Sequence, residues 1–347
     1  MSAPRPTVLV TRELPPELLA PLRARCDVDM HASPEPMPRA ALLAAAARRP
    51  AAILCTLSDR IDAEVLSACG PGLAGVATMS AGVNHVDVAW CARHRVRVGY
   101  TPGVLSEATA DLVVALALLA CRRLVQGVDA ARGERGREWG SWQPFGHCGR
   151  DLHGAHVGIV GAGRIGTAVA RRLRGFGCAI SYTGPSGPKP DFDAEFGATW
   201  RELDALLAAC DVVVLICALT PATAGLLDAR RLRLMRPDAV LVNASRGEVV
   251  VQDALVAVLR ERPGFSAGLD VTTPEPLPLD SELLRLPNCT VLPHLGSATV
   301  ATRTEMARVT VANVLAALDG AEALPLEVPE SAAAAAAARA AAAAPGT

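Results

Sequence analysis

The feature that most constrains this chain is the segment 157–166, in which a short apolar run breaks at three glycines and resumes as a helical pattern. In the pattern G-x-G-x-x-G, Gly161 permits a tight turn, Gly163 lets the backbone approach a pyrophosphate, and Gly166 allows close packing of a helix on a strand. A helix that begins here, at Arg164 and Ile165, presents unpaired N–H groups and the positive end of its dipole to phosphates. The segment therefore predicts a dinucleotide site on a strand–turn–helix unit.

The rest of the chain alternates short β-rich runs with helical ones, which predicts parallel sheets covered on both faces. In the N-terminal part we expect strands at 7–10, 52–55, 75–79 and 96–100, with helices at 16–25, 39–48, 63–69 and 86–93. This part has no glycine fingerprint, so it is not expected to bind the nucleotide. A second unit begins at His156, and its further strands are expected at 179–183, 211–217, 239–243, 266–271 and 290–292.

Four further segments complete the predicted organisation. A long helix begins at Ser106, and a polar segment that carries Trp139 and Trp142 follows it. Because large aromatic side chains are rarely left bare to solvent, we expect this loop to pack on a partner. The helical stretch 299–319 leads back to the first unit. The alanine tract beyond Glu330 is expected to be a frayed helix or disordered.

Composition excludes several classes of protein. The net charge is −1 and the pI is about 6.7, so there is no electrostatic basis for binding nucleic acid or an anionic membrane. The N-terminus lacks a signal-peptide pattern, and the longest apolar run, 112–121, is too short to cross a bilayer. Ten cysteines without a C-x-x-C pair suit a reducing cytosol, and no metal site is expected.

Three polar residues come just after predicted strands, at the sheet edge where parallel sheets bind ligands. They are Arg246, Glu275 and His294. A 2-keto acid needs a planar cation to hold it, and hydride addition to its carbonyl needs a proton donor with a pKa near neutrality. A carboxylate beside the histidine would orient its ring. However, lone Arg and Glu residues are usually solvated and a lone His is often structural, so the residue types leave both interpretations open.

Four ordered motifs support the catalytic interpretation. They stand at 158–166 (GIVGAGRIG), 243–247 (NASRG), 268–276 (GLDVxxPEP) and 293–298 (PHLGSA). Together they resemble the D-isomer-specific 2-hydroxyacid dehydrogenases over about residues 7–328. Further stretches resemble the glyoxylate/hydroxypyruvate reductase branch of that family: 57–59 (LSD), 78–83 (TMSAGV), 98–102 (VGYTP), 141–144 (SWxP) and 219–223 (LTPAT).

The resemblance implies a fold of two doubly wound parallel-sheet α/β domains. A flavodoxin-like substrate domain would comprise 1–104 and 299–330, a Rossmann nucleotide domain 105–298, and a disordered tail 331–347. Reduction of glyoxylate or hydroxypyruvate in the cytoplasm is the implied activity, and a homodimer the implied assembly.

The same resemblance assigns roles to residues. Arg246 would bind the substrate, Glu275 would partner the histidine, and His294 would donate the proton. Backbone N–H groups of Ser80, Ala81 and Gly82 would meet the substrate carboxylate, and Trp142 would wall the partner's pocket. Further positions match those that line the cofactor: Thr109, Leu219, Thr223, Asp270 and Ser297.

One departure bears on the choice of cofactor. After Thr183 stands Gly184, where NAD-using members would carry an Asp for the ribose hydroxyls. A 2′-phosphate therefore meets no repulsion, and Ser186 and Lys189 offer it a hydrogen bond and a charge. We expect NADPH to be preferred and NADH tolerated.

Two alternatives stay open. A nicotinamide-sensing corepressor shares the fold and the triad, so a binding protein is one of them. Another D-2-hydroxyacid dehydrogenase, of the D-3-phosphoglycerate or D-lactate type, is the other. Formate dehydrogenase relatives carry Gln at the position of Glu275, which argues against formate.

Overall fold

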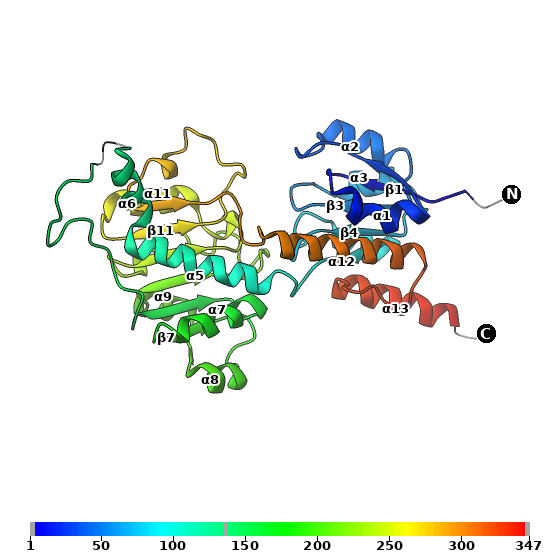
Figure 1. Cartoon of the computed structure of the whole chain (residues 1–347). Helices are drawn as coiled ribbons and strands as arrows, with labels where there is room; N and C mark the ends of the chain where they lie inside the picture. Colours follow the sequence, from blue (N-terminus) through cyan, green and yellow to red (C-terminus); the bar gives the residue numbers. More distant parts are fainter. Residues whose placement is uncertain (1–3, 135, 137, 344–347) are drawn as a thin grey trace. The chain divides into compact units, whose positions relative to one another are not determined.

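The computed structural model describes residues 4–134, 136 and 138–343. They form two compact units (Figure 1). Unit 1 is built from the chain up to Leu105 and again from Thr299 onward, and unit 2 is continuous from Ser106 to Ala298. Each unit contains its own parallel sheet, so the fold class predicted from the sequence is confirmed.

The sheet of unit 1 has the strand order β2-β1-β3-β4-β5, with every neighbouring pair parallel. Its strands are β1 (Thr7–Val10), β2 (Asp27–Met30), β3 (Ala52–Cys55), β4 (Gly75–Thr78) and β5 (Arg97–Gly99). Its helices are α1 (Pro16–Arg25), α2 (Arg39–Ala46), α3 (Ala63–Ala68), α4 (Val88–His94), α12 (Val300–Leu318) and α13 (Pro329–Ala343).

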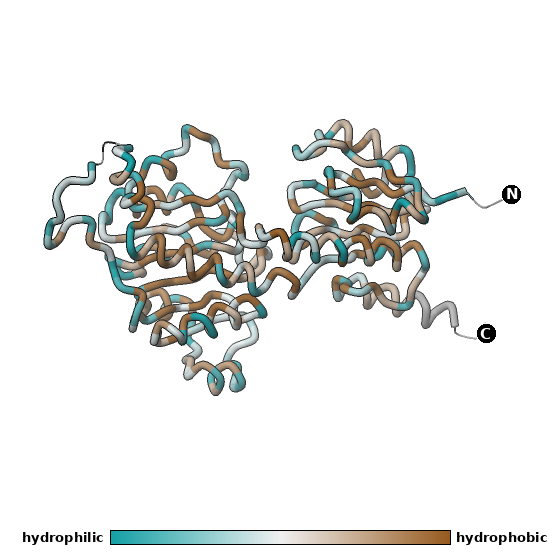
Figure 2. Tube along the Cα trace, in the orientation of Figure 1, coloured by the Kyte–Doolittle hydropathy of each residue, from teal (hydrophilic) through white to brown (hydrophobic). Residues whose placement is uncertain are grey.

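Alternate residues of these strands enter two separate cores. Val8 and Val10 pack with α1 and α12 on one face, whereas Leu9 packs with α2, α3 and α4 on the other. Successive strand side chains point to opposite faces, so a sheet buried on both sides needs apolar residues at both parities. This explains why the central strands β1 and β3 are near-continuous apolar runs; apolar strands appear brown in Figure 2.

The sheet of unit 2 has the order β12-β11-β10-β9-β6-β7-β8 and is also fully parallel. Its strands are β6 (His156–Val160), β7 (Ala179–Thr183), β8 (Thr199–Trp200), β9 (Val212–Leu215), β10 (Val240–Asn243), β11 (Ser266–Leu269) and β12 (Cys289–Val291). Its α-helices are α5 (Ser106–Arg122), α6 (Leu124–Arg132), α7 (Arg164–Arg174), α8 (Pro190–Phe196), α9 (Leu203–Ala209), α10 (Ala229–Leu234) and α11 (Gln252–Glu261), with short 3₁₀ turns η1 (Gly247–Val249) and η2 (Glu282–Leu284).

In unit 2 the long helix α5 packs beside α7 and across β10 and β11 (Figure 1). A Cβ added to Gly268 would lie 2.8 Å from Cγ of Leu116, so this glycine allows the helix to approach the strand closely. Val212 and Val214 join the core under α5 and α7, whereas Val213 joins the core under α9, α10 and α11. The strands β10, β11 and β12 are neighbours and run parallel, so their C-terminal ends lie along one edge of the sheet.

The sequence analysis placed no strand at the edge strands β2 and β8, and no helix at α6. Each edge strand pairs with a neighbour on one side only. Half of the residues of β2 are polar, so the sequence of β2 carries a weak strand signal. The alanine tract, expected to be a frayed helix or disordered, is helical as far as Ala343, where α13 ends, and this helix packs against α4 and β5. Ser331 and Ala335 of this helix are buried. Residues 344–347 lie outside the described part of the chain.

No helix among the described residues is long and apolar enough to span a membrane.

Candidate functional site

The glycine turn has the geometry that a dinucleotide needs. Gly161 has φ +108°, and a Cβ there would lie 2.8 Å from the backbone of Ile216 and Cys217. A Cβ on Gly166 would overlap the carbonyl oxygen of Gly161, so the helix packs against the turn without space for a side chain. At Gly163 an added Cβ meets nothing within 4 Å, which leaves open space in front of the N-terminus of α7. The turn therefore fits a pyrophosphate.

The segment after β7 lies next to this turn. Nζ of Lys189 donates a hydrogen bond of 2.6 Å to the carbonyl oxygen of Ala162, which places the chain's single lysine against the glycine turn. Thr183 is buried at the end of β7, a Cβ on Gly184 would meet open space, and Ser186 is exposed.

The other positions expected to line the cofactor also fall in unit 2. Thr109 is buried on α5, and a Cβ on Gly296 would lie 3.4 Å from its side chain. Ser297 follows directly and is half-buried. Oγ1 of Thr223 accepts the N–H of Thr220 at 2.8 Å, which shapes the turn that contains half-buried Leu219. Their contacts with a cofactor stay a prediction.

Asp270 has a structural task beyond the predicted cofactor contact. Its carboxylate accepts the N–H groups of Leu295 at 2.6 Å and Gly296 at 2.9 Å, and its own carbonyl oxygen accepts the N–H of His294. Burial raises the pKa of Asp270 from its ordinary value, against the opposing effect of these N–H groups. Asp270 thus holds the loop that carries His294, whose backbone is left-handed with φ +53°.

Arg246 is presented by a turn that Asn243 braces. Oδ1 of Asn243 accepts both the N–H and the Oγ–H of Ser245, at 3.0 and 2.7 Å, and Nδ2 donates to the carbonyl oxygen of Arg246 at 3.0 Å. Burial lowers the pKa of Arg246, while the charges of Glu275 and Glu248 raise it. A half-buried guanidinium beside a carboxylate stays charged and is suited to an anionic ligand.

The pair Glu275–His294 is formed. Nδ1 of His294 lies 2.9 Å from Oε2 of Glu275, and Oε1 of that carboxylate accepts the N–H of Thr272 at 3.0 Å. Burial raises the pKa of Glu275, but the hydrogen bond and charge of His294, the Thr272 N–H and Arg246 together hold it below its ordinary value. The carboxylate is therefore ionised, and it orients the imidazole so that Nε2 is the nitrogen available to a ligand.

The structure thus brings Arg246, Glu275 and His294 together at one edge of the sheet of unit 2, after β10, β11 and β12. It places Ser80, Ala81 and Gly82 in unit 1 after β4, where Oγ of Ser80 bonds the carbonyl oxygen of Gly82.

The aromatic residues of the loop before β6 are exposed in the single chain. The exposed fraction is 84% for Trp142, 79% for Trp139 and 90% for Phe145. The expected packing of this loop on a partner stays a prediction.

Sequence reasoning missed the residues that hold these side chains in place. Besides Asn243, Gly247 is required, because a Cβ there would overlap the carbonyl oxygen of Thr272 and separate the Arg246 turn from the Glu275 turn. Both residues belong to the motif at 243–247, and their place beside Arg246 in that motif is the feature of the sequence that could have identified them.

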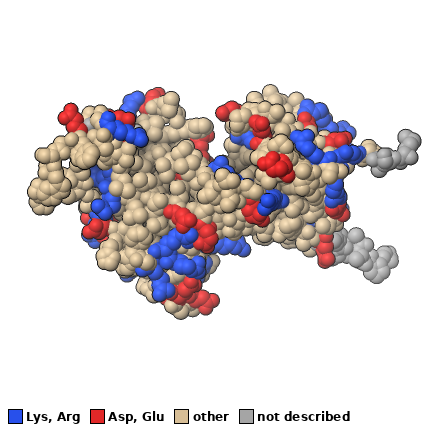
Figure 3. Space-filling model, in the orientation of Figure 1, with Lys and Arg blue, Asp and Glu red and all other residues tan. Residues whose placement is uncertain are grey.

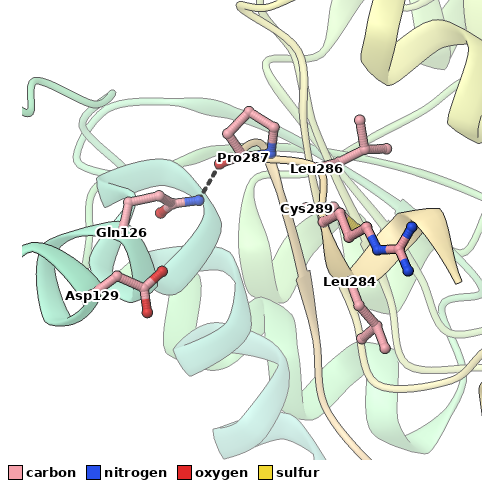
Figure 4. Close-up of a pocket in the computed structure, with 7 residues that line it drawn as sticks. Gln126, Asp129, Leu284, Leu286, Pro287 and Cys289 are labelled. Atoms are coloured by element: carbon pink, nitrogen blue, oxygen red, sulfur yellow. Dashed lines mark hydrogen bonds between the residues drawn. The ribbon is translucent and has the colours of Figure 1, made fainter. Parts of the chain in front are cut away.

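A separate cavity of about 490 Å³ lies between α6 and the segment that leads into β12 (Figure 4). Its lining is Gln126, Asp129, Leu284, Arg285, Leu286, Pro287 and Cys289. Nε2 of Gln126 donates to the carbonyl oxygen of Pro287 across it. It contains none of the residues that the sequence singles out.

Charged side chains of both signs are interspersed on the face shown in Figure 3. On α7, for example, Arg172 pairs with Glu107 and Asp111, and Arg171 pairs with Glu195.

Comparisons with known proteins bear on the family and the fold of the chain. The sequence family described as D-isomer specific 2-hydroxyacid dehydrogenase, NAD binding domain, matches residues 114–296. The glyoxylate reductase/hydroxypyruvate reductase of Mus musculus is 44% identical over 92% of this chain and 97% of its own length, and that of Homo sapiens is 43% identical over the same shares. The crystal structure of an NADPH-dependent glyoxylate/hydroxypyruvate reductase from Sinorhizobium meliloti, in complex with NADP and malonate, is 31% identical. It matches with a TM-score of 0.81 over 94% of this chain and 98% of that one.

With a matching family domain, full-length relatives above 40% identity and both predicted sheets in place, the chain belongs to the D-isomer-specific 2-hydroxyacid dehydrogenases.

Proposed function

We propose that this protein reduces glyoxylate and hydroxypyruvate to glycolate and D-glycerate, with NADPH as the preferred coenzyme. The observation that carries the proposal is the Glu275–His294 hydrogen bond beside Arg246, at the edge of the sheet that contains the glycine turn. The names of the mouse, human and Sinorhizobium relatives support this choice of substrates.

Arg246, His294 and Glu275 each have a defined task in this reaction. Arg246 binds the carboxylate and carbonyl oxygens of the keto acid through its planar guanidinium. A bound nicotinamide dinucleotide would supply the hydride to the carbonyl carbon. His294 delivers a proton from Nε2 to the carbonyl oxygen, and Glu275 keeps the ring oriented. The N–H groups of Ser80, Ala81 and Gly82 are proposed as further donors to the substrate carboxylate.

The preference for NADPH rests on the segment after β7. No acidic side chain follows Thr183 directly, and the ammonium of Lys189 lies against the glycine turn. One ammonium is a competent partner for a 2′-phosphate, and Ser186 adds a hydroxyl. The relative from Sinorhizobium, whose structure contains NADP, is described as NADPH-dependent, which supports the same choice.

We also propose a homodimer in which Trp142 walls the partner's substrate pocket. Three large aromatic side chains exposed on one loop, Trp139, Trp142 and Phe145, are more apolar surface than a monomer usually leaves in water. Tryptophan is also enriched among residues that dominate protein interfaces.

The test is the initial rate of NADPH and NADH oxidation at 340 nm with glyoxylate and with hydroxypyruvate. A higher kcat/KM with NADPH and hydroxypyruvate is the expected result. Turnover only with NADH would contradict the coenzyme preference and favour another D-2-hydroxyacid substrate. Binding of the dinucleotide without turnover would contradict the reductase proposal and favour the corepressor-like alternative.

A further inference from the structure

The turn at residues 272–276, which carries Glu275, has few hydrogen bonds to the rest of unit 2. Pro274 and Pro276 have no N–H group, and within the described part of the chain no backbone-to-backbone hydrogen bond reaches this turn. Its internal bonds are local: Thr272 donates its N–H to Glu275 and its hydroxyl to the carbonyl oxygen of Pro274 at 2.9 Å. Local bonds shape the turn, but they do not fix where it lies relative to His294.

Within the described residues, a side chain from outside the turn donates or accepts one hydrogen bond with the backbone of the turn, and it belongs to Gln252. Oε1 of Gln252 accepts the N–H of Thr273 at 3.1 Å. Gln252 is the first residue of α11, and this helix is anchored by the buried side chains Leu255, Val258 and Leu259. An acceptor mounted on an anchored helix holds the turn at a set distance from the sheet, as a side chain on a flexible loop would not.

We infer that Gln252 is a positioning residue for proton transfer, which holds the turn so that the carboxylate of Glu275 meets Nδ1 of His294. The inference rests on the proposed function, because it matters to catalysis only if His294 donates the proton. Gln252 itself touches neither of the two side chains in any recorded hydrogen bond among the described residues, so it acts through the backbone of Thr273.

Gln252 can hold the turn because its side chain is long enough to bring the acceptor oxygen Oε1 to the N–H of Thr273. Gln252→Met keeps the length and removes the acceptor, Gln252→Ala removes both, and Gln252→Glu keeps an acceptor oxygen. Asp253→Asn is the matched control, since Asp253 is the exposed next residue of the same helix end.

The chemical step is measured in a single turnover of the full-length enzyme, with whichever of NADPH and NADH the wild type oxidises faster. We expect Gln252→Met and Gln252→Ala to slow the chemical step about 10-fold, because a 1 Å misplacement of a catalytic group can cost about 10²-fold and the local bonds of the turn remain. We expect Gln252→Glu and Asp253→Asn to stay within about threefold of the wild type. Coenzyme affinity should be unchanged in all four, which also shows that each variant is folded.

Two further readouts separate positioning from a merely structural role. The solvent deuterium isotope effect on the single turnover should rise in Gln252→Met, because proton transfer becomes slower. In a Glu275→Ala background, Gln252→Met should cause no further loss, because it acts only through Glu275. An additive loss, or a rate of the chemical step in Gln252→Met equal to that of the wild type, would overturn the inference.

Failure of the proposed function has a different signature. If His294→Ala turned over as fast as the wild type, the proton-donor role would be lost and the inference with it. If His294→Ala and Glu275→Ala were slow while Gln252→Met and Gln252→Ala were fast, only the positioning role would be wrong.

Discussion

Nδ1 of His294 lies 2.9 Å from Oε2 of Glu275, although the two residues stand 19 positions apart in the sequence. The parallel pairing of β11 and β12 brings them together, because each residue follows the C-terminal end of its strand. The acceptor, Glu275, thus follows one strand, and its partner, His294, follows the neighbouring strand.

Replacement of His294 by Ala should remove the proton donor. General-acid catalysis is typically worth about 10²–10⁴ in rate, so kcat should fall by that factor. The glycine turn is untouched, so the dissociation constant for NADPH, measured by fluorescence titration, should stay within about twofold. A variant that lost coenzyme binding as well would show His294 to be a structural residue.

Replacement of Glu275 by Gln should change the pH dependence as well as the rate. The pKa of Glu275 is held below its ordinary value of 4.5, so the carboxylate stays ionised as the pH falls until that lowered pKa is reached. The acid limb of kcat/KM that belongs to this group should therefore lie below pH 4.5 in the wild type. The Gln variant, which cannot titrate, should lack this limb and be about 100-fold slower near neutrality. An unchanged acid limb in the variant would assign it to another group.

Replacement of Lys189 by Ala should raise KM for NADPH about 10-fold and leave KM for NADH unchanged, since a charge-assisted contact with a phosphate is worth about 1.5–3 kcal/mol. Lys189→Arg is the control and should keep most of the preference. Equal increases for both coenzymes would instead show that the bond to Ala162 supports the shape of the glycine turn.

Replacement of Trp142 by Ala should raise the apparent KM for hydroxypyruvate, because the proposed wall of the partner's pocket is lost. Trp139→Ala, on the same loop, should change KM less. Sedimentation velocity on both variants shows whether the dimer persists. An unchanged KM for hydroxypyruvate in a dimeric Trp142→Ala enzyme would contradict the proposed role.

The buried ion pair Arg97–Glu327 should stabilise unit 1. The side chains are 10% and 5% exposed, and Glu327 also accepts a hydrogen bond of 2.9 Å from Ser331 on α13. Burial raises the pKa of Glu327, but Arg97 and Ser331 outweigh it, so the pKa is lowered. Its contribution is therefore present above the unfolded-state pKa and is lost as the pH falls through the folded-state pKa.

Glu327→Ala should accordingly lower the free energy of unfolding by about 3–5 kcal/mol at pH 7, because it leaves Arg97 buried without its partner. The difference from the wild type should shrink below pH 4.5, as urea denaturation at several pH values would show. Glu330→Ala, at an exposed acid of the same segment, is the control. A constant difference across this range would mean that packing rather than charge is lost.

Much of the fold could be read from the sequence. The runs at 7–10, 52–55 and 179–183 coincide with strands to the residue, because short runs rich in β-branched, aromatic and other apolar residues are typical of buried strands. The candidate residues Arg246, Glu275 and His294 each stand just after such a run, where parallel sheets bind ligands, and the structure places all three in unit 2; their catalytic roles stay a prediction.

The supports of the site could not be read in the same way. Asp270 was expected to line a cofactor, yet its two carboxylate oxygens hold the backbone after His294. Gln252 gave no signal, because its partner is a backbone N–H 21 positions away. A polar side chain that bonds a distant backbone group has no local pattern.

What the sequence determined by itself, then, is local and periodic: the buried strands, the glycine turn and the residues placed after strand ends. Tertiary structure alone decided the edge strands β2 and β8, the docking of α13 through Ser331 on Val98, and the long-range hydrogen bonds of the site: Thr273 with Gln252, His294 with Glu275, and Gly296 with Asp270. The physical reason is that burial of apolar residues follows from composition along the chain, whereas each of these hydrogen bonds requires two groups that only the folded chain brings within 3.5 Å.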